Sequence, residues 1–174
     1  MGWMEFLRFR LWGCNIGGKG GVTVAYADYT FYVDEYKGDI LTAQDANKWL
    51  SRASDTVDVL TFGRTEKAFP VAAGDVVKVK KAVCAIAEAL CQIDIQTKAM
   101  QATKDADGNY RGAVASLSSG RESVSFVSAA AGSVYGRAAV DMAEKNRLLS
   151  QIAGQYLAGV PDANGVNLLY AGID

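Results

Sequence analysis

One stretch of the chain limits its possible folds more than any other: residues 82–91, with the sequence AVCAIAEALC. If this stretch is helical, apolar side chains lie on nearly every side of it, and Glu88 is the one charged exception. Such a helix has almost no face suited to water, so other elements must cover it on more than one side. The sequence therefore predicts a bundle around a long helix, which we expect to begin at the capping residue Asp75 and to run to about Met100.

The carboxylate of Glu88 needs either water or a partner, because burying an unpaired charge is very unfavourable. Arg52 and Arg64 are the two cations that we expect to supply that partner. The alternative is that Glu88 lies on the one wet edge of its helix. Neither interpretation makes it a catalytic residue.

Two further helices are predicted beside the central one. The first begins at Thr42, which opens a sequence with capping-box spacing, and ends at Gly63. The second runs from about Gly136 to Leu157 and is followed by a glycine and a proline. Ahead of the first helix, a tyrosine-rich cluster at residues 26–36 predicts a short helix or turn. The apolar residues of the first helix recur every three or four positions, as expected of a helix that buries one face: Ala46, Trp49, Leu50, Ala53, Val57 and Leu60.

The remaining segments are predicted to be irregular or extended. Residues 101–120 are rich in glycine, serine and aspartate without periodicity, which favours a long mobile loop. Val124 and Phe126 then alternate with polar residues, so we expect them on one side of a short strand or extended β-arm. The tail, residues 160–174, is more apolar than a frayed end needs, so it either folds back on the core or forms a docking peptide. Its apolar candidates are Leu168, Leu169 and Tyr170.

The predicted fold class is therefore mainly α. We expect a small bundle of three principal helices, with a short N-terminal helix or turn and an extended β-arm or hairpin.

The first 24 residues differ from the rest of the chain and end in a glycine-rich cluster. Charged residues interrupt their apolar run, which argues against a secretory signal. Gly17 to Val22 begins like a phosphate-binding loop but lacks the Lys-Ser or Lys-Thr end that such a loop needs. Lys19 to Val22 can instead be encoded by a ribosome-binding sequence, with Val24 at a suitable distance to be the start codon. We therefore expect residues 1–24 to be a non-native leader and residues 25–174 to form a single helical domain.

The residue types needed for catalysis or metal binding are sparse. The chain has no histidine, which removes the commonest general base and the commonest metal ligand. Cys84 and Cys91 lie in an apolar stretch without the close pairing of zinc or redox motifs, so we interpret them as reduced core residues. The acidic stretch 105–109 lacks the later ligands of a calcium-binding loop. We expect no catalytic residue, no cofactor and no metal site.

The charge balance limits the possible partners. The net charge is −1 and the longest basic run is the pair Lys80-Lys81, so the chain lacks the cationic field that holds nucleic acid tightly. No window approaches the roughly 18 consecutive apolar residues of a membrane-spanning helix. We expect a protein that is made in a reducing cytoplasm and does not enter membranes.

Four segments carry a resemblance to a known family. They are the opening AYADYTFYVDEYKGDILTAQDANKWLSRASDTVDVLTFGR, the helix VKKAVCAIAEAL, the extended RESVSFV and the ending QYLAGVPDANGVNLLYAGID. In this order they resemble the head-tail connector, or adaptor, proteins of long-tailed double-stranded-DNA bacteriophages and prophages. The first segment begins directly after Val24, and the four are spread along most of the chain from there.

The resemblance implies a non-enzymatic structural protein of the virion neck that is assembled in the host cytoplasm. It implies a dodecameric ring that binds beneath the portal protein, extends the DNA channel without sequence-specific binding, and presents a surface to a stopper or tail-completion protein. A closed ring joins two different surfaces of each subunit. Apolar residues predicted outside the helical core are candidates for that interface: Val124, Phe126, Leu168, Leu169 and Tyr170.

Two other classes of function are alternatives. An enzyme would need paired carboxylates, or a serine with a lysine, at helical spacing, and the sequence does not display that arrangement. A small helical DNA-binding or regulatory module would need a recognition helix rich in Arg, Lys, Asn or Gln. The predicted helix 136–157 carries three scattered cations, which are Arg137, Lys145 and Arg147.

Overall fold

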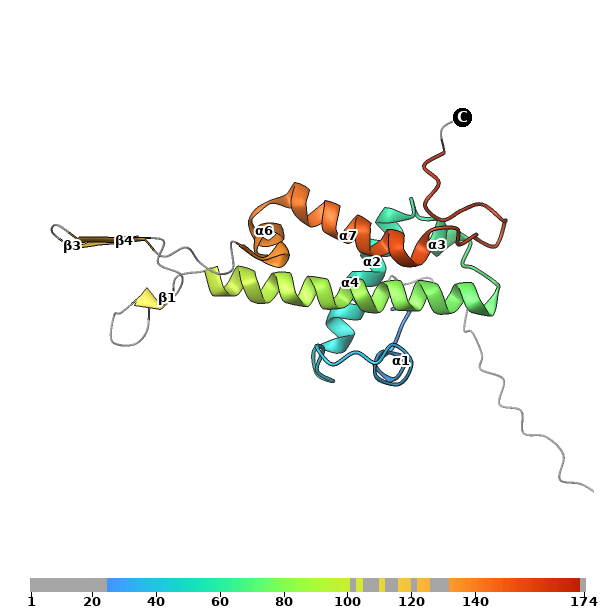
Figure 1. Cartoon of the computed structure of the whole chain (residues 1–174). Coiled ribbons are helices and arrows are strands. Elements are labelled where there is room, and N and C mark those ends of the chain that lie inside the picture. The colour runs from blue at the N-terminus through green and yellow to red at the C-terminus, as the bar shows by residue number, and fades with distance from the viewer. Residues whose placement is uncertain are drawn as a thin grey trace, which may run out of the picture.

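The computed structural model of the chain describes residues 25–100, residues 132–172 and four short strands between these two ranges (Figure 1). The predicted leader, residues 1–24, lies outside the described residues, as does most of the predicted loop 101–120. A long helix, α4 (Ala73–Met100), runs through the middle of the molecule, and the other main helices pack against it (Figure 1). The fold is therefore mainly helical, as the sequence predicts.

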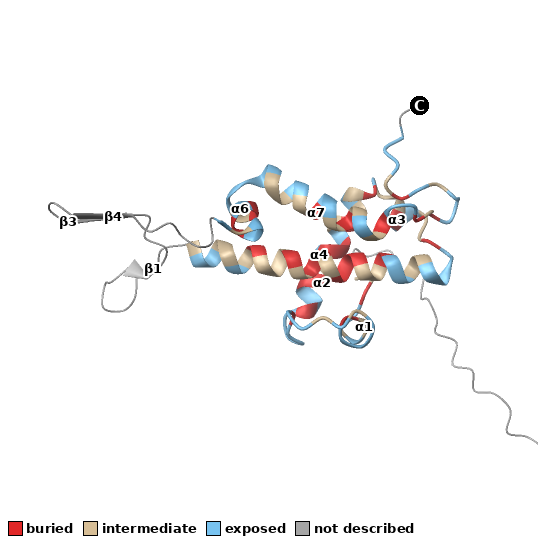
Figure 2. Ribbon diagram, viewed as in Figure 1, coloured by how far each residue is buried: buried red, intermediate tan, exposed pale blue. Residues whose placement is uncertain are grey.

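The central helix α4 is covered on several sides, which confirms the interpretation of its apolar middle. Helices α2, α6 and α7 contact it over most of its length, and α1 contacts it as well. Figure 2 shows the buried positions concentrated in the middle of α4, where the other helices meet it. The buried residues include several alanines, and these small side chains let the neighbouring helices approach closely: Val79, Ala82, Val83, Cys84, Ile86, Ala87, Ala89 and Ile93.

Helix α2 (Ala46–Leu60) begins four residues after the predicted start, because Thr42 to Asp45 forms a turn ahead of it. Within that turn the amide of Asp45 donates to the carbonyl of Thr42 at 3.1 Å. The predicted apolar face is correct, since its residues 46, 49, 50, 53 and 57 are buried and Leu60 is partly buried against the core. The helix ends at Leu60, before the predicted stop at Gly63; Gly63 adopts a left-handed conformation with φ of 70° and directly precedes the short α3 (Arg64–Lys67).

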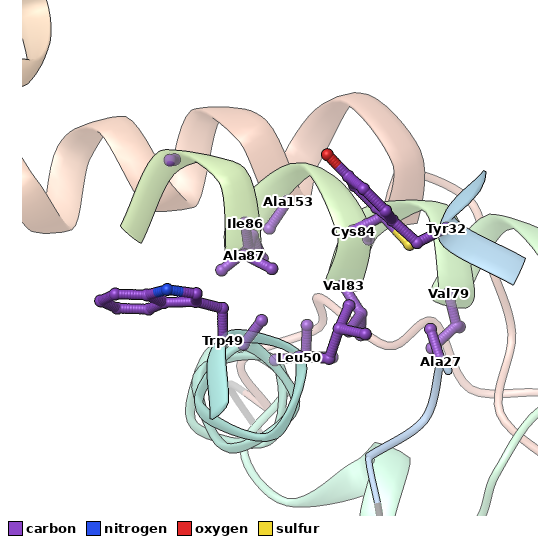
Figure 3. Packing of buried hydrophobic residues seen from close by; sticks show 14 of the residues in the cluster. Ala27, Tyr32, Trp49, Leu50, Val79, Val83, Cys84, Ile86, Ala87 and Ala153 are labelled. Atoms are coloured by element: carbon purple, nitrogen blue, oxygen red, sulfur yellow. The ribbon is translucent and has the colours of Figure 1, made fainter. Parts of the chain in front are cut away.

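Figure 3 shows how α2 packs on the central helix. Trp49 and Leu50 extend from α2 toward Val83, Ile86 and Ala87 of α4. Leu50, Val83, Ile86 and Ala87 are inaccessible to solvent, and Trp49 is buried. Burying a large apolar side chain of this kind contributes roughly 2 kcal/mol. The contact between α2 and α4 is thus the centre of the hydrophobic core.

The predicted last helix is two helices in the structure, α6 (Val134–Val140) and α7 (Met142–Leu157). The break is at Asp141, whose backbone is extended and whose carboxylate accepts a hydrogen bond from the amide of Ala143 at 2.8 Å. Asp141 therefore caps the N-terminus of α7 and cannot continue α6. The prediction of one uninterrupted helix from Gly136 was wrong for this reason.

The aromatic cluster near the start of the described chain forms a short helix, α1 (Tyr29–Asp34), in agreement with the prediction. Asp28 caps it by accepting a hydrogen bond from the amide of Phe31 at 2.8 Å. The ring of Tyr32 is completely buried and lies between those of Tyr29 and Tyr36. Helix α1 thereby adds an aromatic layer to one side of the core.

Four short strands lie between α4 and α6. Antiparallel pairing joins β1 (Thr103–Lys104) to β2 (Tyr110–Arg111) and β3 (Ser116–Ser119) to β4 (Glu122–Ser125). Val124 lies in β4 opposite Leu117, but its side chain and the whole of Phe126 lie outside the described residues. These short ladders do not support an extended β-arm as a part of the fold. A role in assembly for Val124 and Phe126 stays a prediction.

The C-terminal segment folds back on the bundle. Val160 and Leu168 are both inaccessible to solvent, and the amide of Leu168 donates to the carbonyl of Val160 at 2.9 Å. Asp162 organises the intervening loop by accepting hydrogen bonds from the amides of Asn164 and Val166. The tail was predicted either to fold back on the core or to form a docking peptide. For Leu168 the first alternative is correct.

Candidate assembly surfaces

The predicted interface residues of the tail occupy different environments. Leu168 belongs to the core, so the prediction that it contacts a partner must be corrected: its side chain is already covered within the subunit. Leu169 is partly buried against the same core. The side chain of Tyr170 is 47% exposed, with the guanidinium of Arg64 centred 5.9 Å from its ring. Within the described tail, Tyr170 is the candidate that stays accessible to a partner.

The partners of Glu88 are tyrosines and not the predicted arginines. The hydroxyl of Tyr32 donates to one carboxylate oxygen at 2.7 Å, and the hydroxyl of Tyr36 donates to the other at 3.3 Å. Both tyrosines come from the segment around α1, which packs on the face of α4 that carries Glu88. Arg52 instead lies over the ring of Trp49. The predicted ion pair was wrong because the hydroxyls of Tyr32 and Tyr36 are the groups that pack against this carboxylate.

This tyrosine cluster, defined by Tyr32, Tyr36, Tyr156 and Glu88, joins three helices. Tyr36 is hydrogen-bonded to Tyr156 of α7 as well as to Glu88 of α4. Burial, together with the hydrogen bond to Glu88, raises the pKa of Tyr32 to about 12. Burial and the neighbouring charge of Glu88 raise the pKa of Tyr36 further. Tyr32 and Tyr36 therefore stay neutral at physiological pH, and the cluster is a structural network of hydrogen bonds.

The two described cysteines are free thiols, and neither is activated. Cys84 is buried and Cys91 is half-buried, as expected of core residues. Burial raises the pKa of the Cys84 thiol to about 12, and burial also raises the pKa of the Cys91 thiol. A nucleophilic cysteine needs the opposite shift. Both cysteines are therefore best explained as packing residues of the core.

A cleft of about 380 Å³ opens between α2, α4 and α7 beside Trp49. Two cations flank the Trp49 ring: the ammonium of Lys48 lies 4.3 Å from the ring centroid, and the guanidinium of Arg52 lies at 5.2 Å. Asp94 lies in the cleft, and its carboxylate is already bound to Lys98 at 2.6 Å. We call this surface the Trp49 cleft, and it is lined by Trp49, Arg52, Thr56, Leu90, Ile93, Asp94, Thr97 and Lys145. Its lining is mostly polar and includes the cations Arg52 and Lys145 and the carboxylate of Asp94, while the ring of Trp49 is buried beneath it.

The other end of α2 is acidic. Asp58 is near the carboxylates of Asp55 and Glu66, and burial together with these charges raises its pKa. A hydrogen bond of 2.6 Å from the hydroxyl of Tyr26 holds the Asp58 carboxylate in place. Two large apolar side chains, Val59 and Phe62, project beside these acids and are 75% and 58% exposed. We call the surface formed by these five residues, Asp55, Asp58, Val59, Phe62 and Glu66, the acidic ridge.

Phe62 has an unusual backbone conformation in addition to its exposure. Its φ is 56°, in the left-handed region that bulky residues rarely adopt. This conformation costs on the order of 1 kcal/mol relative to a glycine. Phe62 lies outside the core cluster, so packing in the subunit core does not offset the strain of its backbone or the exposure of its side chain. Exposure and strain at one apolar residue suggest a contact beyond the subunit.

Lys48 and Asp58 oppose the helix dipole of α2, whereas the carboxylate of Asp45 at its N-cap agrees with the dipole. Helix N-termini favour negative side chains and C-termini favour positive ones. The first turn of α2 contains no acidic residue and the last turn contains no basic one. Lys48 lies near the start and Asp58 near the end, while the side chain of Asp45 at the N-cap accepts no hydrogen bond from the helix amides. The sequence analysis missed this inversion, although the order of charges along residues 48–58 would have been sufficient to find it.

Comparisons of the chain with protein-family models, curated proteins and solved structures found no match. Among the residues that the structure describes, no group of three His, Cys, Asp or Glu side chains is placed to hold a metal ion. No helix in the described part of the chain is both long and apolar enough to span a membrane. The features that point to function are therefore the Trp49 cleft, the acidic ridge and the exposed apolar side chains.

Proposed function

We propose that this chain is a structural subunit of the connector ring that joins the portal to the tail in a long-tailed double-stranded-DNA bacteriophage. The segments that resemble this family include the sequences of α1, α2, the middle of α4 and the end of α7. A mainly helical bundle agrees with the fold that the resemblance implies. In this role the protein acts by binding and has no catalytic step.

The observation that carries the proposal is the exposure of large apolar side chains outside a completed core. The core is closed around α4, and yet several valines, a methionine and a phenylalanine remain more than half exposed. They lie at the ends of helices, where a second protein can reach them, and exposed apolar groups of this kind mark interaction surfaces. The residues are Val59, Phe62, Val71, Val140 and Met142.

The proposed partners follow from the ring. Each subunit contacts two neighbours through two different surfaces, and the ring as a whole contacts the portal on one side and a stopper or tail-completion protein on the other. Tyr170, exposed near the end of the described tail, is a candidate for one of these contacts. DNA passes through the channel without sequence-specific binding, for which a net charge of −1 is suitable. The proposed location is the virion neck.

The alternative, a helical DNA-binding or regulatory module, has less support from the geometry. A recognition helix would present free cations along one face. In α7 the guanidinium of Arg147 is bound to Glu144 at 2.6 Å, and Lys145 lines the Trp49 cleft. Neither cation belongs to a continuous basic face.

Native mass spectrometry and negative-stain microscopy of the purified chain test the proposal. We expect a closed ring, formed either by the chain alone or after addition of portal particles. A chain that stays monomeric with and without the portal would contradict the proposed function. Salt-sensitive binding to duplex DNA at micromolar concentration would favour the regulatory module instead.

A further inference from the structure

We propose that the corner between α6 and α7 of one subunit docks into a groove beside Ile95 on a second copy of the same chain. This inference rests on the proposed function, because it names the two surfaces that meet between neighbouring subunits of the ring. We call the first surface the Met142 corner, which consists of Val140, Asp141 and Met142. We call the second the Ile95 groove, which lies between the segment that leads into α2 and the C-terminal half of α4.

The Met142 corner presents two large apolar side chains to solvent. Val140 is 73% exposed and Met142 is 67% exposed, on either side of the extended residue Asp141 where the chain turns from α6 into α7. Both lie outside the core cluster, so the fold of the single subunit does not account for them. Apolar side chains that are exposed together in this way mark an interaction surface.

The Ile95 groove offers these side chains an apolar seat. Ile40 and Ile95 line it and are themselves 38% and 48% exposed, and the half-buried Cys91 lines it as well. Its volume of about 220 Å³ suits one large side chain and is too small for a helix. Methionine is unbranched and adapts its shape to irregular apolar gaps, so Met142 is the side chain that we assign to the groove.

Charge complementarity fixes how the corner enters the groove. At the rim, Lys98 is already bound to Asp94 at 2.6 Å, whereas the exposed Lys48 has no salt bridge to a described residue. Asp141 is exposed and uses one carboxylate oxygen to cap α7. Because Asp141 directly precedes Met142, docking of Met142 brings this carboxylate to the rim, where Lys48 is the cation able to pair with it. An opposite charge at the rim of an apolar contact sets its register.

The two surfaces lie on opposite sides of α4 and share no residue. Ile93 lines the Trp49 cleft together with Lys145 of α7, whereas Ile95 lines the groove. Two positions along a helix separate these side chains by about 200°, so the start of α7 and the groove face away from each other. Figure 1 shows the same arrangement, with α6 and the start of α7 above α4 and the start of α2 below it.

This separation is what a ring requires. Each subunit must use two different surfaces, and each surface must stay free while the other is occupied. The acidic ridge contains no residue of either surface, so it stays available to the portal or to the stopper.

Complementary substitutions test whether the two surfaces meet. A corner variant carries Met142→Lys and a groove variant carries Ile95→Glu. Sedimentation velocity should show that each variant alone self-associates at least about tenfold more weakly than the wild type, because an unpaired charge replaces an apolar contact. Mixed in equal amounts, the two variants should recover assembly. In an alternating ring every lysine then meets a glutamate, and every other contact is that of the wild type. A single chain with both substitutions should recover assembly as well.

The matched controls are Val71→Lys and Val71→Glu. They place the same charges at an apolar residue that is 79% exposed and belongs to neither surface, so they should leave self-association unchanged. Circular dichroism should show that all variants remain folded, and Ile40→Glu repeats the groove test if the Ile95 variant unfolds. If the wild type assembles only on portal particles, the same variants are compared on those particles.

The outcomes separate this inference from the proposed function. If the wild type forms rings and both single variants also form them normally, the inference is wrong while the proposed function stands. Weak single variants without recovery in the mixture or in the double variant would mean that the two surfaces do not meet each other, and the inference is again wrong. A wild-type chain that stops at a dimer also overturns it, because a contact between two different surfaces leaves one of each unoccupied at that stage. A wild-type chain that is monomeric both alone and with portal overturns the proposed function as well.

Discussion

The phenol oxygen of Tyr32 lies 2.7 Å from a carboxylate oxygen of Glu88, and this one hydroxyl serves three hydrogen bonds. It donates to Glu88 and accepts from the amides of Ile40 and Leu41 at 2.9 and 3.0 Å. The bonds link α1, the central helix and the segment that leads into α2. Because Tyr32 is inaccessible to solvent, water cannot replace any of these partners without opening the structure.

The variant Tyr32→Phe should lower the free energy of unfolding by roughly 2–4 kcal/mol, since it leaves a carboxylate oxygen and two amides without their partner while the ring still fills its site. Urea denaturation followed by circular dichroism measures the change. Tyr29→Phe is the matched control, because the hydroxyl of the half-buried Tyr29 has no such network, and a change below about 0.5 kcal/mol is expected. Equal effects of the two substitutions would contradict the role given to the Tyr32 hydroxyl.

Stability should fall at alkaline pH in a window set by Tyr32. Its pKa rises from 10.0 to about 12 on folding, so the contribution is fully present below pH 10 and is lost as the pH rises toward 12. The loss due to this residue is roughly 2–3 kcal/mol, and the other phenols with raised pKa values add to it. Urea denaturation at pH 8, 10 and 11 measures the decline. Tyr32→Phe should show a shallower decline than the wild type, and an identical slope would count against the assignment.

Gly38 should tolerate no side chain, for reasons of space. A Cβ at this position would lie 2.2 Å from the ring of Tyr32, which is fully buried and cannot move aside. Gly38→Ala should therefore lower the free energy of unfolding by roughly 3 kcal/mol or more. Gly74→Ala is the control: a Cβ there meets nothing within 4 Å, and alanine favours the helix by up to about 1 kcal/mol. Thermal denaturation of both variants should give changes of opposite sign.

The contrast between α2 and Glu88 shows what the sequence can and cannot predict. The buried face of α2 follows from the spacing of its apolar residues, because a helix of fixed period puts them on one side. The partner of Glu88 does not follow from spacing. It depends on which segment packs over one face of α4, and that packing joins residues more than fifty positions apart. Tertiary contacts of this kind leave no recognisable pattern in the sequence around either residue.

The break between α6 and α7 had a local signal that the apolar pattern obscured. Asp141 and Glu144 have the spacing of a capping box, which marks a helix start. The apolar residues on either side continue with helical period across the break, so the pattern alone predicts one helix. The candidate surfaces were harder still, since the exposure of Phe62 follows from a backbone conformation and the Trp49 cleft needs three helices.

Phe62 should show opposite effects on stability and assembly. Asparagine adopts the left-handed conformation more readily than phenylalanine, so Phe62→Asn should raise the free energy of unfolding by roughly 0.5–1 kcal/mol while removing the exposed aromatic side chain of the acidic ridge. Binding to portal particles measured by sedimentation velocity should weaken in the same variant, because the ridge is one of the exposed apolar surfaces on which the proposed function rests. Val59→Asn is the matched control: Val59 lies in regular helix, so this substitution relieves no strain, and we expect weaker assembly without a gain in stability. A Phe62 variant that is less stable and assembles normally would mean that the side chain serves the fold of its own subunit.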